Sequence, residues 1–154
     1  MPLRDDCVDV VYSSHSLEPN GGRESEAIAE CLRVGSTVVL VEPIYELAGK
    51  AAQKRMDEHC YVRGLKKAAE SLGAEVLEYR LLECCANPYN PSGVIVLRRN
   101  ARKSDRCDLN VWMCPMTDST LMKYDDFWYA EEVGIAYPIL KDVSMLRPEH
   151  AIVA

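Results

Sequence analysis

The sequence predicts an α/β domain followed by a small all-β module. Two observations support this fold class. Over the first hundred residues, short apolar runs typical of buried strands alternate with segments of helical periodicity. After residue 110 the helical periodicity disappears, and short apolar pieces alternate with turns. The predicted boundaries are residues 1–100 for the α/β domain, 101–109 for a basic linker and 110–154 for the β module.

The chain opens with a predicted strand, helix and second strand. Residues 8–12 form a short apolar run, as expected for a strand buried on both faces. From Arg23 the apolar residues recur at helical spacing, and Gly35 is expected to end this helix. Residues 37–41, "TVVLV", give a second buried strand. The three segments together predict a right-handed parallel crossover unit.

Two helices and two strands are expected to follow. Helical patterns cover residues 46–59 and 62–72, and strand patterns cover 75–82 and 93–99. The stretch between these strands, "ECCANPYNPS", has the composition of a loop. In the first helical pattern, the residues expected to face a core are Leu47, Ala51, Ala52 and Met56.

Two stretches carry a resemblance to a known family. "LRDDCVDVVYSSHSLEPN" and "ECLRVGSTVVLVEPIYELA" resemble segments of class I S-adenosylmethionine-dependent methyltransferases. The family's sheet has strand order 3-2-1-4-5-7-6 with strand 7 antiparallel. The resemblance implies half of a Rossmann-like methyltransferase sheet, strands 4-5-7-6 with helices, in which Val8 to Ser13 is strand 4 and residues 37–41 are strand 5.

The first half of that family's sheet has no counterpart in this sequence. It carries the glycine-rich turn that approaches the cofactor and the acidic residue that holds the ribose. We therefore expect a protein that is inactive alone, or completed by another chain. Strand Val8 to Ser13 would then lie at a sheet edge, which predicts a homo-oligomer or pairing with a second polypeptide through this strand.

The candidate catalytic residues follow the first strand. "SSHSLEPN" would lie at the carboxyl edge of the sheet, where such folds bind ligands. The resemblance implies S-adenosylmethionine as cofactor, and Ser13 and Ser14 are the candidates to lie beside it. His15 is the candidate general base, because histidine side chains exchange protons near neutrality. Glu18 is the second candidate catalytic residue.

Two further residues are candidates for binding the methyl acceptor. Asn20 closes the same loop, and Glu42 follows the second strand. Each candidate also has a structural interpretation: His15 as a loop histidine bonded to backbone, Glu18 as a solvated or capping carboxylate, and Asn20 as a turn residue. The sequence does not indicate which class of acceptor would bind.

The C-terminal module carries a second resemblance. "CPMTDSTLMKYDDFWYAEEVGIAYPILKDVSML" is similar to a family of small zinc-ribbon-like methyltransferase activators. Cys114 stands at a family cysteine position, but Thr117 stands where the next cysteine would be, so metal binding is not implied. The aromatic residues expected to hold this module together are Trp112, Trp128, Tyr129 and Tyr137.

Three functional hypotheses follow. The first is a methyltransferase-like protein whose cofactor half is supplied by another chain. The second is a noncatalytic binding partner or regulator of a methyltransferase. The third is an RNA-associated module that uses the basic stretch at residues 98–106, although the net charge of -6 argues against broad nucleic-acid binding.

The composition argues against several other classes of protein, namely disulfide-rich, zinc-binding, membrane-spanning and secreted proteins. The seven cysteines are an odd number, which favours reduced thiols over a disulfide framework, and their spacing does not predict a zinc site. No apolar run approaches the roughly 18 to 20 residues that cross a bilayer. The N-terminal stretch "MPLRDDC" lacks the apolar core of a secretion signal. We therefore predict a cytoplasmic protein without membrane contact.

Overall fold

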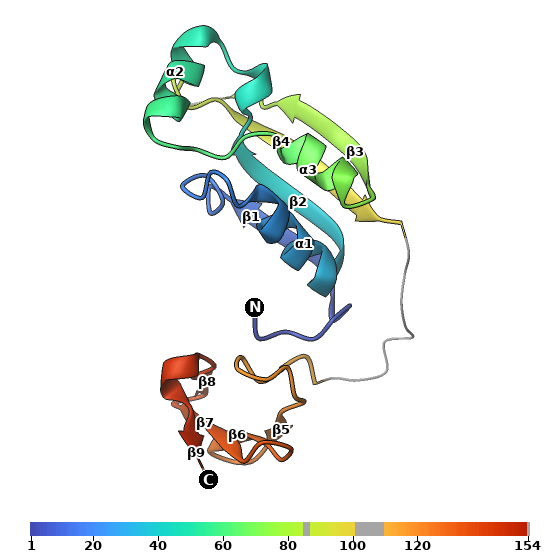
Figure 1. Cartoon of the computed structure of the whole chain (residues 1–154), viewed down its shortest axis with the longest axis vertical. Helices are drawn as coiled ribbons and strands as arrows, with labels where there is room; N and C mark the ends of the chain where they lie inside the picture. The colour runs from blue at the N-terminus through green and yellow to red at the C-terminus, as the bar shows by residue number, and fades with distance from the viewer. Residues whose placement is uncertain (85–86, 101–109, 154) are drawn as a thin grey trace. The chain divides into compact units, whose positions relative to one another are not determined.

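The computed structural model describes residues 1–84, 87–100 and 110–153 (Figure 1). The chain divides into two compact units, one of Val8–Ser104 and one of Met1–Cys7 with Asp105–Ala154. The predicted first domain contained residues 1–100, whereas the structure groups the first seven residues with the C-terminal unit, where Leu3 forms a β-bridge with Trp112. The predicted basic linker, and with it most of the stretch 98–106, lies outside the described residues.

The larger unit is a mixed α/β structure, as predicted. The predicted helical stretch 46–59 is divided into a 3₁₀ turn and a helix. The elements are β1 (Val8–Ser14), α1 (Glu24–Val34), β2 (Gly35–Pro43), the 3₁₀ turn Tyr45–Leu47, α2 (Lys50–Glu58), α3 (Leu65–Ser71), β3 (Ala74–Leu81) and β4 (Ser92–Arg99).

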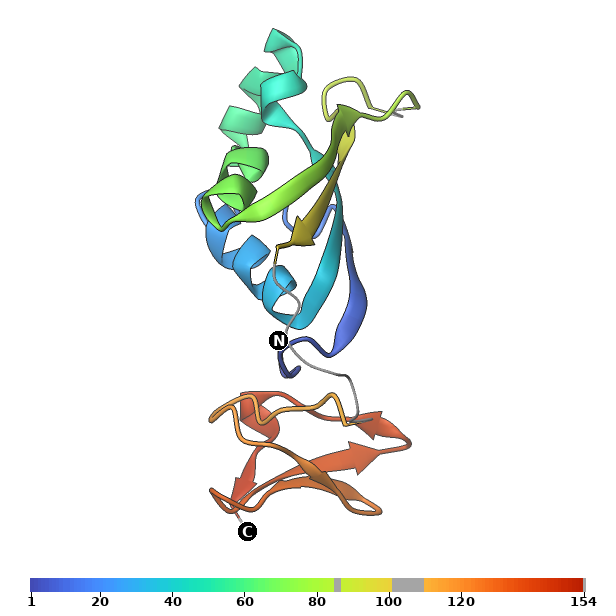
Figure 2. The same ribbon diagram turned by 90° about the vertical axis from the view of Figure 1, so that its right-hand side faces the viewer.

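The sheet of this unit has the strand order β1-β2-β4-β3 (Figure 2). β1 and β2 are parallel, and Val11 lies beside Val38. β4 is antiparallel to both of its neighbours, and it lies between them. β1 therefore lies at one edge of the sheet, as the sequence predicted.

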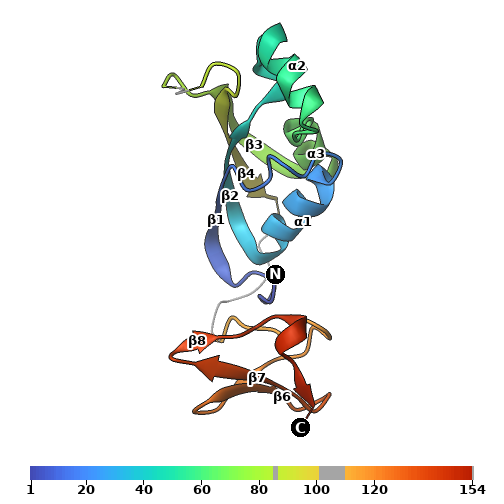
Figure 3. The ribbon, with the colours of Figure 1, turned by 90° about the vertical axis from the view of Figure 1, so that its left-hand side faces the viewer.

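Helices cover one face of this sheet. α1, α2 and α3 lie on the same side of the strands (Figure 3). Glu24 and Glu26 lie in the first turn of α1, where their negative charges interact favourably with the helix dipole. The apolar stripe of this helix, Ile28, Cys31 and Leu32, is buried. The other core residues are Val38, Leu40, Ile44, Val62, Leu65, Ala69, Ala74, Ile95 and Leu97.

The opposite face of the sheet carries apolar side chains, and at β1 these side chains are exposed to solvent. Val10 is 55% exposed and Tyr12 is 64% exposed. The strand register places Val39 beside Tyr12, and Val96 beside Val39, on this same face. The prediction that the first strand is buried on both faces is therefore wrong for this unit, because its helices cover one face only.

The smaller unit is built from short strands and one 3₁₀ turn. Its strand order is β5-β6-β7-β8, and β9 pairs with β7. The buried core contains Cys114, Leu121, Trp128, Ala130 and Tyr137. The elements are β5 (Met122–Lys123), β6 (Phe127–Ala130), β7 (Ile135–Leu140), β8 (Val143–Ser144), the 3₁₀ turn Pro148–His150 and β9 (Ile152–Val153).

The predicted aromatic core of this unit is only partly correct. Trp128 and Tyr137 are buried, and Trp112 packs at the margin of the core. Tyr129 instead lies outside that cluster, with its ring 6.5 Å from the ring of Phe127. The reason is the alternation of β6, in which Trp128 and Ala130 point inward and Tyr129, between them, points outward.

Candidate functional site

The residues predicted from the sequence lie at the carboxyl edge of the parallel strands β1 and β2. β1 ends at Ser14, and the following loop passes this edge before α1 begins. β4 runs in the opposite direction, so its first residue, Ser92, lies at the same edge and pairs with Pro43. Residues far apart in the sequence therefore meet here.

The carboxylate of Glu42 holds the loop in place. Glu42 is fully buried, and its Oε1 accepts hydrogen bonds from Ser13 Oγ at 2.8 Å and from the backbone N–H groups of Ser16 and Leu17 at 3.1 and 3.2 Å. Its Oε2 accepts from the N–H of Glu18 at 3.1 Å. Glu42 and Ser13, candidates for binding acceptor and cofactor, thus position the loop that carries the other candidates.

His15 joins two side chains that are distant in the sequence. Its Nδ1 lies 2.5 Å from Oε2 of Glu18, and its Nε2 lies 2.8 Å from Oγ of Ser92. His15 has a φ of 51°, a left-handed conformation that is uncommon outside glycine. Its backbone N–H donates to the carbonyl of Val41 at 2.9 Å, which holds the backbone of His15 against the end of β2.

Several donors keep the Glu18 side chain ionised. Burial raises the pKa of Glu18, but hydrogen bonds from His15, Tyr61 and Asn90 outweigh burial and hold this pKa below its ordinary value. Asn90 Nδ2 donates to Oε1 at 3.1 Å. The Glu18 carbonyl also accepts from the N–H of Val62 at 3.1 Å. Glu18 is thus a carboxylate fixed by partners from three parts of the unit.

Ser14 and Asn20 have different surroundings. Ser14 is exposed, and its carbonyl accepts from Ser16 Oγ at 3.3 Å. Asn20 Nδ2 donates to the carbonyl of Ser16 at 3.3 Å, and its N–H donates to the carbonyl of Leu17 at 2.9 Å. Asn20 therefore closes the turn, as its structural interpretation proposed.

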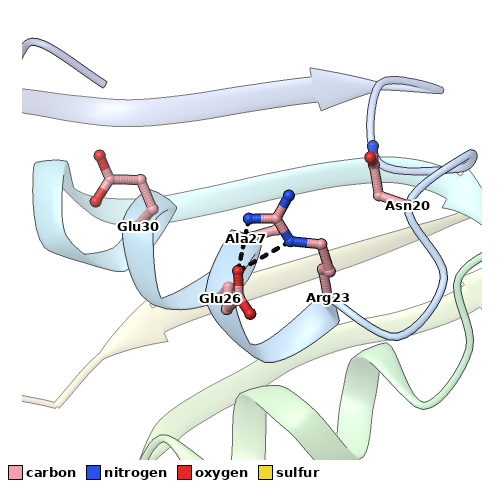
Figure 4. Close-up of a pocket in the computed structure, with 5 residues that line it drawn as sticks. All are labelled: Asn20, Arg23, Glu26, Ala27 and Glu30. Carbon is pink, nitrogen blue, oxygen red and sulfur yellow. Dashed lines mark hydrogen bonds and ion pairs between the residues drawn. The ribbon is translucent and has the colours of Figure 1, made fainter.

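Asn20 also lines a cavity of about 400 Å³ along α1 (Figure 4). Arg23 reaches across it to Glu26, with Nε and Nη2 at 2.9 and 2.7 Å from Oε2. Glu30 lies at the other end, and its hydrogen bond with Arg33 lowers its pKa to about 2. Because Glu26 pairs with the Arg23 guanidinium and Glu30 is ionised, this cavity does not favour an anion.

Sequence reasoning missed Ser92, Asn90 and Tyr61. One feature of the sequence could have predicted the position of Ser92. When the last strand is antiparallel to the parallel strands beside it, its first residue lies at their carboxyl edge. Tyr61 and Asn90 reach Glu18 from loops, and no periodicity predicts where a loop side chain points.

No family model, curated protein or solved structure matches this chain. Within the described residues, no group of three or more His, Cys, Asp and Glu side chains is arranged to hold a metal ion. The described helices are too short or too polar to span a bilayer.

Proposed function

We propose that residues 8–99 form the carboxyl-terminal half of a methyltransferase sheet of the class I S-adenosylmethionine-dependent type. The chain acts in methyl transfer when strands that carry the cofactor-binding half pair with β1. The observation that carries this proposal is the strand order β1-β2-β4-β3 with parallel β1 and β2 and antiparallel β4. This order corresponds to 4-5-7-6 in that family, in which strand 7 is antiparallel.

The open edge and open face of the sheet support the same proposal. Strands of doubly wound sheets are covered on both faces, and an apolar edge strand attracts another strand. Val10 and Tyr12 are exposed here, beside the half-buried Val39 and Val41. The complementary half would add strands next to β1 and helices over these side chains. In this proposal a second polypeptide supplies that half.

The proposed chemistry takes place at the carboxyl edge. Methyl transfer from a sulfonium is an in-line displacement, so the protein positions donor and acceptor and removes a proton where the acceptor carries one. His15 is the proposed base, and the Glu18 carboxylate holds its Nδ1. Ser14 lies at the end of β1, where the cofactor would approach, while Ser13 and Glu42 keep the loop in position.

The test supplies the missing half in trans. The strand 1 to strand 3 half of a characterised class I methyltransferase is purified, mixed with this chain, and titrated with S-adenosylmethionine by calorimetry. We expect the two polypeptides to co-elute in size-exclusion chromatography and to bind the cofactor with micromolar affinity, which neither shows alone.

A matched pair of variants locates the contact. Tyr12→Asp on β1 should abolish co-elution and cofactor binding, because it places a charge on the open apolar face. Leu77→Asp, at another exposed position on the far-edge strand β3, should change neither. Failure of the halves to associate, or a complex that does not bind the cofactor, would refute the proposal.

A second candidate function is a noncatalytic partner or regulator of a methyltransferase. The observation that favours it is the outer face of the smaller unit, where exposed apolar side chains extend across β5, β6 and β7. These are Met122, Tyr124, Phe127 and Leu140. Micromolar binding of S-adenosylmethionine that appears only when this chain is complemented would favour the first proposal over this second candidate.

A further inference from the structure

Ser92, His15 and Glu18 form a hydroxyl–imidazole–carboxylate chain. Oγ of Ser92 lies 2.8 Å from Nε2 of His15, and Nδ1 of the same ring lies 2.5 Å from the Glu18 carboxylate. The contact between His15 and Ser92 joins residues 77 positions apart in the sequence, so the fold and not local geometry creates it.

The order of donors along this chain follows from Glu18. An ionised carboxylate can only accept hydrogen bonds, so Nδ1 carries the proton that it shares with Glu18. In the neutral imidazole Nε2 is then the acceptor, and the hydroxyl of Ser92 donates to it. This is the arrangement in which a histidine withdraws a proton from a serine nucleophile.

The three groups are held firmly on one side and accessible on the other. Asn90 and the loop that Glu42 fixes restrain Glu18, and the left-handed backbone of His15 aims its ring toward β4. The His15 side chain is 38% exposed and Ser92 is half-buried, so a small molecule in solution can reach the hydroxyl.

We propose that Ser92 is a nucleophile for acyl transfer, with His15 as its general base and Glu18 as the residue that positions the ring, and that the site takes small activated esters. This activity goes beyond the proposed methyl transfer and does not depend on the complementary half of the sheet, because all three residues belong to β1–β4 and their loops.

The reaction balances with water alone. Ser92 Oγ bonds to the ester carbonyl carbon while Nε2 of His15 takes the hydroxyl proton. The carbon–oxygen bond of the ester breaks, and the departing alkoxide takes that proton. Water then attacks the acyl-serine, giving its proton to Nε2, which returns it to Ser92 Oγ as the carboxylic acid leaves.

The test uses a fluorophosphonate probe on the full chain. Ser92 Oγ attacks phosphorus, the phosphorus–fluorine bond breaks, and the serine proton leaves through His15. Peptide mass spectrometry should place the adduct on Ser92. Labelling should be absent in Ser92→Ala and unchanged in Ser71→Ala, an exposed serine of α3 whose hydroxyl donates within its own helix.

The two supporting residues have separate readouts. His15→Ala should slow labelling on the order of 100-fold, the usual contribution of a general base. Glu18→Gln keeps a hydrogen-bond acceptor but loses the charge, and it should slow labelling about 10-fold while shifting the downfield Nδ1–H proton resonance of His15. If Glu18 had only a structural role, Glu18→Gln would change neither the labelling rate nor the Nδ1–H resonance of His15.

An adduct on Ser92 that requires His15, in variants whose circular dichroism matches the wild type, supports the proposed nucleophile. Absence of an adduct from the wild-type chain, an adduct on another residue only, or equal labelling of His15→Ala overturns it. Para-nitrophenyl acetate hydrolysis should follow the same ranking of variants.

Discussion

Replacement of Glu42 by Ala should destabilise the larger unit by about 3 kcal/mol. Glu42 is fully buried and accepts from Ser13 Oγ and from three backbone N–H groups. Ser16 is exposed, so water replaces the lost partner of its N–H. The remaining three donors each lose about 1 kcal/mol, the lower end of the range, because removal of the buried charge also relieves its desolvation.

A conservative variant separates charge from shape. In Glu42→Gln, Oε1 still accepts from Ser13 and Leu17, but an NH₂ group replaces Oε2 and faces the N–H of Glu18. Two donors then oppose each other. We expect an intermediate loss of about 1 to 2 kcal/mol, with most of the loop bonds retained.

The assay can follow each unit separately. The described helices α1, α2 and α3 belong to the larger unit, so far-ultraviolet circular dichroism in urea follows its unfolding. The two tryptophans, Trp112 and Trp128, belong to the smaller unit, so their fluorescence is an internal control. The dichroism midpoint of Glu42→Ala should fall by about 1 to 3 M while the fluorescence midpoint stays constant.

Amide exchange provides the decisive control for this prediction. The N–H groups of Leu17 and Glu18 should exchange faster in Glu42→Ala, because they lose the carboxylate that protects them. A dichroism midpoint within about 0.3 M of the wild type, or unchanged exchange of these amides, would show that Glu42 does not hold the loop.

Gly93→Ala should cost about 1 to 3 kcal/mol by dichroism, because a Cβ at this position would lie 2.6 Å from the carbonyl oxygen of Arg80. Burial and the Glu46 carboxylate raise the pKa of Tyr79 to about 12 from an ordinary value of 10.0, so the larger unit should lose stability as pH rises from 10 toward 12, and Tyr79→Phe should flatten this loss. In the smaller unit, where Tyr137 is fully buried, Tyr137→Ala should cost about 3 to 5 kcal/mol by tryptophan fluorescence and Tyr137→Phe about 1, and equal losses would contradict the packing argument.

The sequence predicted the elements of the larger unit better than their packing. Apolar periodicity located α1 and β2, because these elements bury one stripe or one alternating face. It was wrong for Leu47 and Ala51, which are exposed. The 3₁₀ turn Tyr45–Leu47 and the break at Gly49 separate Leu47 from α2. A helical pattern that treats both segments as one helix therefore assigns the wrong residues to the buried face of α2.

The candidate site was predictable where its residues are local. His15 and Glu18 share one loop, and their spacing of three residues is enough to bring them together. Ser92 joins them only through the pairing of β4 with β2, which a single sequence does not specify. A carboxylate near the end of a strand, such as Glu42 in β2, can face a ligand or the loop, and the backbone path decides between these two.

The loop at the carboxyl edge does not need the complementary half of the sheet to form. Its carboxylate anchor, its imidazole and its hydroxyl partner come from β2, the loop after β1 and β4, all within the larger unit. The experiment on covalent labelling and the experiment on methyl transfer can therefore give opposite results, and each result tests only its own proposal. If the chain is labelled at Ser92 but binds no cofactor when complemented, the nucleophilic site is supported and the methyltransferase proposal is refuted. A complemented chain that binds the cofactor but resists the probe would leave His15 as a base for the methyl acceptor alone.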